Sequence, residues 1–225
     1  MPRKPAVPED LSDKKALALE VIARLKKEYP DAACTLDYDH AWQLLVSVRL
    51  AAQCTDARVN IVVEDLFAKY PSVAALAAAE PEEIEAIVKP CGLGHSKARD
   101  ISACMRMLRD KYDCKVPTTF EELLSLPGVG RKSANLIMGD VFGKPAIVTD
   151  THCIRLCNKI GLVDGIKEPQ KVEMALWKII PPEEGSDLCH RFVMHGRAVC
   201  NARKPECEKC CLRDICRYAR ENAAT

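Results

Sequence analysis

The sequence predicts an all-α fold, and three observations support this prediction. Apolar residues recur at helical spacing in almost every segment, and proline or glycine ends most of these segments. The one β-like run, residues 146–148, is too short to found a sheet. With 225 residues, 48% of them apolar and 29% charged, the chain can bury a core as one globular domain or two small ones. No stretch approaches the roughly 18 uncharged apolar residues of a membrane-spanning helix, so we expect no membrane partner.

In the N-terminal half, the pattern predicts an amphipathic helix over residues 13–29, followed by Pro30, and a buried helix over residues 40–53, which are strongly apolar. Thr55 can cap the next helix, which ends before Pro71. Two short helices, a turn and a longer helix are then predicted at residues 73–78, 82–88, 91–95 and 96–112.

In the C-terminal half, two helices flank a glycine-containing turn, at residues 119–125 and 131–141. The Gly-Lys-Pro sequence at residues 143–145 interrupts the helical pattern. Asp150 precedes a helix over residues 151–160, where its carboxylate can cap the first turn. Two further helices are predicted at residues 169–180 and 188–199.

The turn between these two flanking helices has the sequence Leu126-Pro-Gly-Val-Gly-Arg-Lys132. Two glycines at spacing two let the backbone turn tightly, because neither carries a Cβ that could collide. The backbone N–H groups around Gly128 and Gly130 can then point outward at the positive end of the following helix. This helix–hairpin–helix pattern can bind a phosphate of a nucleic acid backbone. The alternative is a plain corner between two helices with an exposed lysine.

Thirteen cysteines are many for a cytosolic chain, and five of them fall between residues 200 and 216. Cysteines elsewhere in the chain lie in apolar stretches and are expected to behave as small hydrophobes, as at Cys54, Cys104, Cys153 and Cys157. The clustered cysteines follow the spacing Cys200-x6-Cys207-x2-Cys210-x5-Cys216, with Cys211 in addition. Four thiolates from one loop can bind an iron–sulfur cube or a tetrahedral zinc ion. The spacing leaves open whether Cys210 or Cys211 is the third ligand.

The formal net charge is only +1, so the global charge does not predict nucleic-acid binding. Between residues 189 and 220, however, eight Lys or Arg accompany three acidic residues. This local excess could contact phosphates, or it could form an ordinary solvated face. The first five residues lack the apolar core of a secretion signal and predict a short flexible arm. We therefore expect a cytoplasmic or nucleoid-associated protein.

Five motifs together resemble the endonuclease III family of helix–hairpin–helix DNA glycosylases. They match in order and spacing over nearly the whole chain, from residue 15 to residue 218. In chain order they are Ala51-Ala-Gln-Cys-Thr-Asp56, Gly92-Leu-Gly-His-Ser-Lys-Ala98, the turn at residues 126–132, Val148-Thr-Asp-Thr-His152 and the cysteine spacing.

The resemblance implies a DNA glycosylase and abasic-site lyase of base excision repair, which removes oxidised pyrimidines from duplex DNA. Lys132 would be the nucleophile that attacks C1′ of the sugar, displaces the base and forms a Schiff base, after which the strand is cut by β-elimination. Asp150 would be the essential carboxylate, which takes up a proton or stabilises positive charge on the sugar.

The resemblance also implies which residues contact DNA. The target base must leave the duplex, and Gln53 and Leu93 would fill the gap that it leaves. The other implied DNA contacts are Gly128, Val129, Gly130, Arg131 and His152. At Gly94-His95 the sequence departs from the commoner family pattern, which affects contacts to the opposite base rather than the chemistry.

A two-lobed fold is implied as well. Residues 34–144 would form a helical barrel with the helix–hairpin–helix, and residues 1–33 together with 145–225 would form an iron–sulfur cluster domain. A 4Fe–4S cluster would be bound by Cys200, Cys207, Cys210 and Cys216, which leaves Cys211 out. We expect a monomer whose partner is double-stranded DNA containing oxidised pyrimidines or abasic sites.

Two alternative functions share parts of this pattern. An adenine-mismatch glycosylase has the same fold and cluster but lacks the hairpin lysine, and it carries a catalytic glutamate near the position of Arg49 in this chain. A non-catalytic iron–sulfur DNA-binding module would use the same hairpin without the lysine chemistry. Lys132 argues against the first alternative, and a test for a covalent intermediate separates the lyase from the second.

Overall fold

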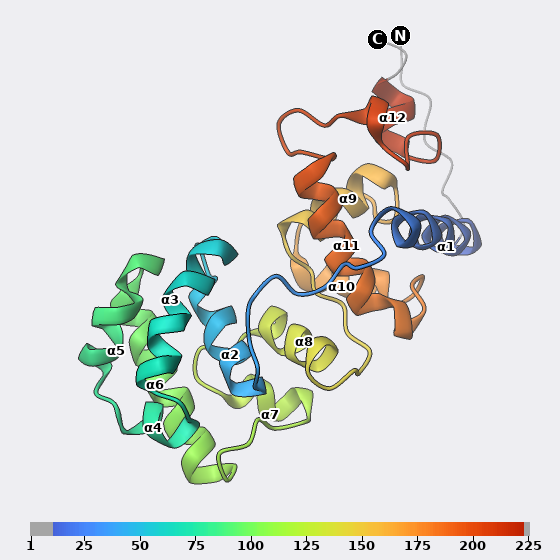
Figure 1. Ribbon diagram of the computed structural model, residues 1–225. Coiled ribbons are helices and arrows are strands. Elements are labelled where there is room, and N and C mark those ends of the chain that lie inside the picture. The colour runs from blue at the N-terminus through green and yellow to red at the C-terminus, as the bar shows by residue number, and fades with distance from the viewer. Residues whose placement is uncertain (1–10, 223–225) are drawn as a thin grey trace. The chain divides into compact units, whose positions relative to one another are not determined.

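A computed structural model describes residues 11–222, so the arm expected at the first five residues lies outside the described part. Within residues 11–222 every regular element is a helix and no strand occurs, which confirms the all-α prediction (Figure 1). The described residues form two compact units, one of residues 34–144 and one that combines residues 11–33 with residues 145–222. None of the described helices has the length and apolar character needed to cross a membrane.

The unit of residues 34–144 consists of a set of α-helices and one 3₁₀ turn. They are α2 (Ala41–Leu50), α3 (Asp56–Lys69), α4 (Val73–Ala78), α5 (Pro81–Val88), η1 (Lys89–Cys91), α6 (Gly94–Lys111), α7 (Phe120–Ser125) and α8 (Arg131–Asp140). Helix α6 packs against α4 and α5, while α2 packs against α3, α6 and α8. Helices α7 and α8, which flank the glycine turn, pack against each other.

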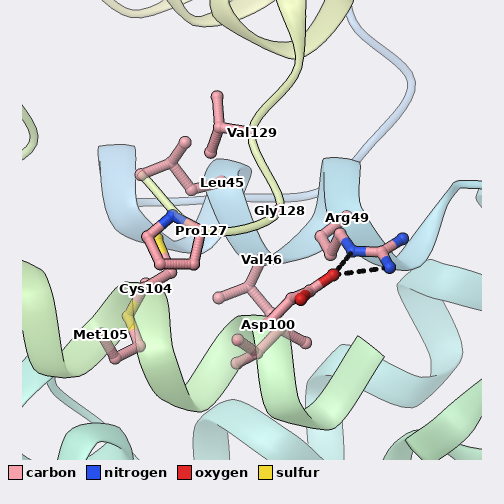
Figure 2. A pocket seen from close by; sticks show the side chains of 10 residues that line it. Leu45, Val46, Arg49, Asp100, Cys104, Met105, Pro127, Gly128 and Val129 are labelled. Carbon is pink, nitrogen blue, oxygen red and sulfur yellow. Dashed lines mark hydrogen bonds and ion pairs between the residues drawn. The ribbon is translucent and has the colours of Figure 1, made fainter. Parts of the chain in front are cut away.

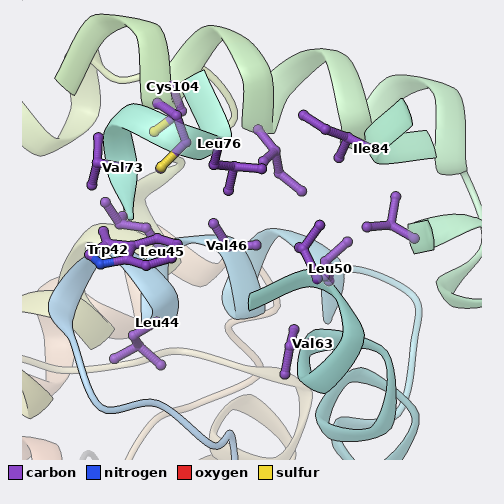
Figure 3. Packing of buried hydrophobic residues seen from close by; sticks show 14 of the residues in the cluster. Trp42, Leu44, Leu45, Val46, Leu50, Val63, Val73, Leu76, Ile84 and Cys104 are labelled. Atoms are coloured by element: carbon purple, nitrogen blue, oxygen red, sulfur yellow. The ribbon is translucent and has the colours of Figure 1, made fainter. Parts of the chain in front are cut away.

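Helix α2 lies at the centre of this unit, as its strongly apolar sequence predicts. Figure 3 shows Val46 and Leu50 on the side of α2 that faces Leu76 and Ile84, with Leu44 on the opposite side. All of these side chains are buried, so α2 has apolar neighbours on both sides. The helix ends at Leu50 rather than at residue 53, because Gln53 adopts a φ of 58°, which a right-handed helix does not allow.

Side-chain caps fix several helix starts in this unit. The Thr55 hydroxyl accepts a hydrogen bond from the Arg58 N–H, as predicted, and Ser72 and Thr119 cap α4 and α7 in the same way. Helix α6 starts at Gly94, two residues earlier than predicted, because Leu93 with its left-handed backbone supplies the turn that precedes it.

The second unit contains α1 (Leu11–Glu28), α9 (Thr151–Ile160), α10 (Pro169–Leu176), η2 (Pro182–Glu184), α11 (Gly185–Ala198), η3 (Cys207–Lys209) and α12 (Arg217–Asn222). Helix α11 packs against α1 and α9, and α12 packs against α9.

Two helix boundaries in this unit differ from the prediction by three residues or more. Helix α10 ends at Leu176 rather than at residue 180, because the N–H of Ile179 turns back to the Leu176 carbonyl in a tighter 3₁₀-type bond before Pro181 and Pro182. Helix α11 begins at Gly185 rather than at residue 188. A Cβ at Gly185 would lie 2.4 Å from the Ala146 carbonyl oxygen, so only glycine fits this first turn.

Candidate functional site

The glycine turn between α7 and α8 leaves the N-terminus of α8 open. Gly128 has a φ of 74°, a left-handed conformation that favours glycine, and Gly130 is the N-cap of α8 without a side-chain cap. A Cβ at Gly130 would meet nothing within 4 Å, so the first N–H groups of α8 can be approached from outside. The Val129 N–H, in contrast, donates to the Leu126 carbonyl at 3.1 Å. The amides suited to an anion are therefore those at the start of α8, because the Val129 N–H is already paired.

An ion pair between α2 and α6 lies directly against the turn. Arg49 on α2 and Asp100 on α6 are joined by two contacts to Asp100 Oδ2, from Nη2 at 2.7 Å and from the Nε–H at 2.7 Å. Figure 2 shows this pair beside Gly128, at the edge of a small cavity between α2, α6 and the turn. A Cβ on Gly128 would lie 2.9 Å from Asp100 Cβ and 3.1 Å from Arg49 Cδ. The turn thus packs against the ion pair. Glycine is required at residue 128 because a larger side chain would collide with this pair and because the backbone has a positive φ.

Replacing Gly128 by alanine should lower the free energy of unfolding by about 1–3 kcal/mol, because the new Cβ meets the ion pair and the backbone conformation disfavours any L side chain. Urea unfolding followed by circular dichroism measures this loss. Gly130→Ala is the matched control, since its φ is −98° and its Cβ has open space. An equal loss in both variants would contradict the account of the turn.

Lys132 is the second residue of α8, and its side chain is exposed. The neighbouring Arg131 has its guanidinium carbon 5.0 Å from the centre of the Phe120 ring on α7. This cation–π contact ties the first turn of α8 to the preceding helix. Of the two adjacent cations, Arg131 is engaged in packing the hairpin, and Lys132 extends from the same helical turn into solvent.

Gln53 and Leu93, the two residues expected to enter the duplex, share an unusual backbone conformation. Both have a positive φ, 58° and 52°, and the described chain has only two other non-glycine residues of this kind, Asp113 and Cys114. A left-handed leucine is uncommon and costs on the order of 1–3 kcal/mol. Leu93 is also 57% exposed although it is apolar. Strained and exposed side chains at these two turns suit insertion into another molecule.

Asp150 lies in the other unit and is the N-cap of α9. Its Oδ1 accepts a hydrogen bond of 2.7 Å from the Cys153 N–H. The carboxylate is half-buried. Because each carboxylate oxygen can accept more than one hydrogen bond, the capping contact leaves further capacity for a second partner.

His152 packs between α9 and α11. Its Nδ1 accepts a hydrogen bond of 3.1 Å from Arg155 Nη2, and that same nitrogen of Arg155 also donates to the carbonyls of Gly196 and Cys200. A Cβ at Gly196 would lie 2.3 Å from His152 Nδ1, so the ring fits tightly against the glycine. These contacts give His152 a structural position beside the residues that lead into the cysteine loop.

Four of the five clustered cysteines line one cavity at the end of the second unit: Cys200, Cys207, Cys210 and Cys216. Cys211 is not among the residues that line it, and its carbonyl instead accepts a hydrogen bond from Arg24 Nη1 on α1. Across residues 11–222, no three Cys, His, Asp or Glu side chains already converge at metal-binding geometry. The thiols therefore surround a common space without closing on its centre.

Burial of these thiols opposes their ionisation, and nearby protein groups compensate this effect only in part. Burial raises the pKa of Cys210 to about 12, and the nearby sulfurs of Cys211, Cys200 and Cys216 add to the rise. Burial also raises the pKa of Cys200, although the charges of Lys159 and Arg155 oppose that rise. A cationic group in the cavity would stabilise the thiolates, so the donor set fits a metal centre.

His195 connects Cys210, which lines this cavity, to Tyr29, the residue after α1. Burial lowers the pKa of His195 to about 4, so its ring is neutral near pH 7. Its Nε2 lies 3.3 Å from Cys210 Sγ, and its Nδ1 lies 3.0 Å from the Tyr29 hydroxyl. These contacts are compatible with the Nε2–H facing the sulfur and Nδ1 accepting from the tyrosine.

Comparison with known proteins places these features in one family. Residues 46–182 match the family described as the HhH-GPD superfamily of base excision DNA repair proteins. The chain belongs to this superfamily. An Endonuclease III from Synechocystis sp. is 44% identical to it over 207 residues, which is 92% of this chain and 94% of that protein.

Two solved structures of Endonuclease III resemble this HhH-GPD chain at 40% sequence identity. One is a non-covalent Endonuclease III–DNA complex, with a TM-score of 0.88 over 94% of this chain and 99% of that chain. The other is a trapped Endonuclease III–DNA covalent intermediate, with a TM-score of 0.87 over 93% of this chain and 98% of that chain. The resemblance that the motifs indicated is therefore confirmed, together with the fold.

Half of the eight Lys and Arg residues between residues 189 and 220 of this HhH-GPD chain form ion pairs within their own unit. Arg191 is only 4% exposed and is paired with Asp187. Three further cations are paired with acidic residues: Lys209 with Glu206, Arg213 with Glu208 and Arg217 with Asp164. Arg203 and Lys204 are exposed on the loop between Cys200 and Cys207. The count of charges therefore overstated the basic surface, because it did not reveal which cations have carboxylate neighbours.

Sequence reasoning missed two features of the HhH-GPD unit that contains the hairpin. The Arg49–Asp100 pair joins residues 51 positions apart, and no local pattern predicts such a contact. Lys97 is completely buried. The sequence held a signal for this burial, because Lys97 falls in helical register with the buried residues Ile101, Cys104, Met105 and Leu108 on α6.

Proposed function

We propose that this chain is a bifunctional DNA glycosylase and abasic-site lyase, which as a monomer removes oxidised pyrimidines from double-stranded DNA in the cytoplasm. The observation that carries the proposal is Lys132 in the first turn of α8, directly after the open hairpin amides. The resemblance to a protein trapped in a covalent DNA intermediate supports a nucleophile in this family. An ε-amine beside a phosphate-binding helix terminus meets this need.

In the proposed reaction, the N–H groups at the start of α8 bind a phosphate and bring the sugar to Lys132. The Nζ lone pair attacks C1′, the N-glycosidic bond breaks, and the base leaves with a proton. Loss of a proton from the nitrogen and ring opening give a Schiff base. Removal of a C2′ proton then expels the 3′ phosphate by β-elimination, and water releases the lysine.

Asp150 supplies the carboxylate that the proposed reaction needs. As base it accepts the proton that the amine loses, and as carboxylate it stabilises the positive charge that develops on the sugar. Its bond to the Cys153 N–H fixes one oxygen at the start of α9 and so orients the group. An oriented carboxylate loses less conformational entropy when the substrate arrives.

The cysteine cavity fits a 4Fe–4S cluster bound by Cys200, Cys207, Cys210 and Cys216, because these thiols surround one space and Cys211 does not. When bound, the cluster supplies four iron–sulfur bonds that cross-link the loop. Arg203 and Lys204 lie on the segment between the first two ligands, and they would contact the DNA backbone.

Replacing Cys210 by alanine should remove most of the iron from the purified protein, because one of the four cavity thiols is lost. Cys211→Ala is the matched control, and it should retain the iron content and the visible absorption of the wild type. Iron and sulfide analysis of both proteins, purified without oxygen, measures the difference. Loss of iron in the Cys211 variant with retention in the Cys210 variant would reverse the ligand assignment.

Borohydride trapping on defined duplexes tests the proposed function. We expect a covalent protein–DNA adduct with both thymine glycol and abasic-site duplexes, since the Schiff base is reduced to a stable amine. Tight binding without an adduct would instead indicate a non-catalytic DNA-binding module. Removal of adenine from mismatches without trapping would indicate the mismatch glycosylase.

A further inference from the structure

Lys97 on α6 is a completely buried cation that takes no part in the proposed chemistry of Lys132. Its ammonium donates to the Leu50 carbonyl at 2.8 Å and to the Cys91 carbonyl at 2.8 Å. Burial lowers the pKa of Lys97, and the neighbouring thiols of Cys54 and Cys91 oppose this only in part. A buried ammonium is costly unless its N–H groups are satisfied, so these two carbonyls determine where the side chain lies.

The two carbonyls stand where two functional loops begin. Leu50 is the last residue of α2, and its carbonyl is one of those that a helix end leaves without an intrahelical partner. Gln53 follows three residues later. Cys91 ends η1, and Leu93 follows two residues later as the N-cap of α6. A single cation therefore joins the starts of the loops that carry Gln53 and Leu93.

Both loops also contact each other beside this cation. Burial raises the pKa of Cys91 to about 11, and the nearby thiol of Cys54, the residue after Gln53, adds to the rise. The sequence predicted Cys54 as a small hydrophobe of an apolar stretch. Cys54 does pack, half-buried, against the apolar core of its unit, although it lies in the turn after α2 because α2 ends at Leu50.

We propose that Lys97 is a positioning residue for base extrusion. By binding the Leu50 and Cys91 carbonyls at once, it sets the separation of Gln53 and Leu93, so that both side chains enter the duplex together. This inference rests on the proposed function, in which these two side chains fill the gap left by the target base. The strained backbone at both residues requires such an external restraint.

The test compares two substrates that differ in the need for insertion. In duplex DNA with thymine glycol, the base must leave the stack, whereas a single-stranded oligonucleotide with an abasic site needs no gap to be filled. Lys97→Met should lower base removal from the duplex by about 100-fold, because the inserted side chains are misplaced. Strand cleavage at the single-stranded abasic site should change little. Lys111→Met on the same helix, an exposed lysine, is the charge-matched control and should resemble the wild type on both substrates.

A second measurement detects the insertion of Gln53 and Leu93 into the duplex independently of base removal. The fluorescence of 2-aminopurine, placed beside the lesion, rises when the stack opens, and Lys97→Met should reduce that rise. In a background of Gln53→Ala with Leu93→Ala, adding Lys97→Met should cause no further loss on the duplex, because the side chains that it positions are already gone. Circular dichroism checks the fold, and Lys97→Gln, which keeps a donor for one carbonyl, replaces the methionine variant if that protein does not fold.

Equal losses on both substrates, an unchanged duplex rate, or an additive loss in the triple variant would each overturn the positioning role. Failure of the proposed function looks different. In that case the wild type would cleave neither substrate, while the 2-aminopurine signal would still report whether Lys97 controls insertion.

Discussion

Lys132→Ala should form no borohydride-trapped adduct, and its rate of base removal should fall on the order of 10³-fold or more. The reason is that the variant has no amine at the start of α8 to attack C1′, while the hairpin amides that bind phosphate remain. Because Lys132 is exposed, the substitution should leave the free energy of unfolding almost unchanged. Single-turnover excision of thymine glycol and gel analysis of the adduct measure both effects.

Lys115→Ala serves as the control for this experiment, since Lys115 is an exposed lysine of the same unit, with 79% of its side chain accessible. It should trap as the wild type does. The affinity of Lys132→Ala for an abasic-site duplex should fall far less than its activity, because phosphate binding depends on the helix terminus. An undiminished adduct with Lys132→Ala would remove this residue from the role of nucleophile.

Asp150→Asn should lower the rate of base removal by about 10²–10⁴-fold with almost no change in stability. Asparagine is as good an N-cap as aspartate, so its side-chain oxygen can still accept the Cys153 N–H that Asp150 Oδ1 accepts now. What it lacks is the negative charge and the basic oxygen. The substitution therefore separates the chemical role of the carboxylate from its structural one.

Asp150→Ala completes the comparison, because it removes the cap as well as the charge and should cost about 1 kcal/mol of stability in addition. Urea unfolding and single-turnover kinetics on the same preparations distinguish the two losses. If Asp150→Asn were as active as the wild type while Asp150→Ala were both unstable and inactive, Asp150 would be a helix cap and nothing more.

The order of helices could be predicted from the sequence because helical periodicity is a local property. The caps at Thr55 and Asp150 were predictable for the same reason, since each acts on the turn that follows it. Helix ends were less predictable where the backbone leaves the helix through a positive φ, as at Gln53, or where a close contact selects the residue, as at Gly185.

The candidate site was predictable only where its chemistry lies within a short stretch. The hairpin and the cysteine spacing are continuous motifs. The spacing left open whether Cys210 or Cys211 is the third ligand, and our proposal of Cys210 is supported by its place in the lining of the cavity, which Cys211 does not share. Gly128 packs against Arg49 and Asp100, and this contact joins three segments that are distant in the sequence. The hydrogen bonds from Lys97 to the Leu50 and Cys91 carbonyls do the same. Such contacts depend on tertiary packing, which no periodicity encodes.

The central claim is that the amine of Lys132 becomes bonded to C1′ of the damaged nucleotide. Protease digestion of the borohydride-reduced complex, followed by mass spectrometry, locates the nucleotide remnant on the chain. We predict that the remnant is found on the peptide that contains Lys132 and on its ε-nitrogen. A remnant on another lysine or on the terminal amine would contradict the claim.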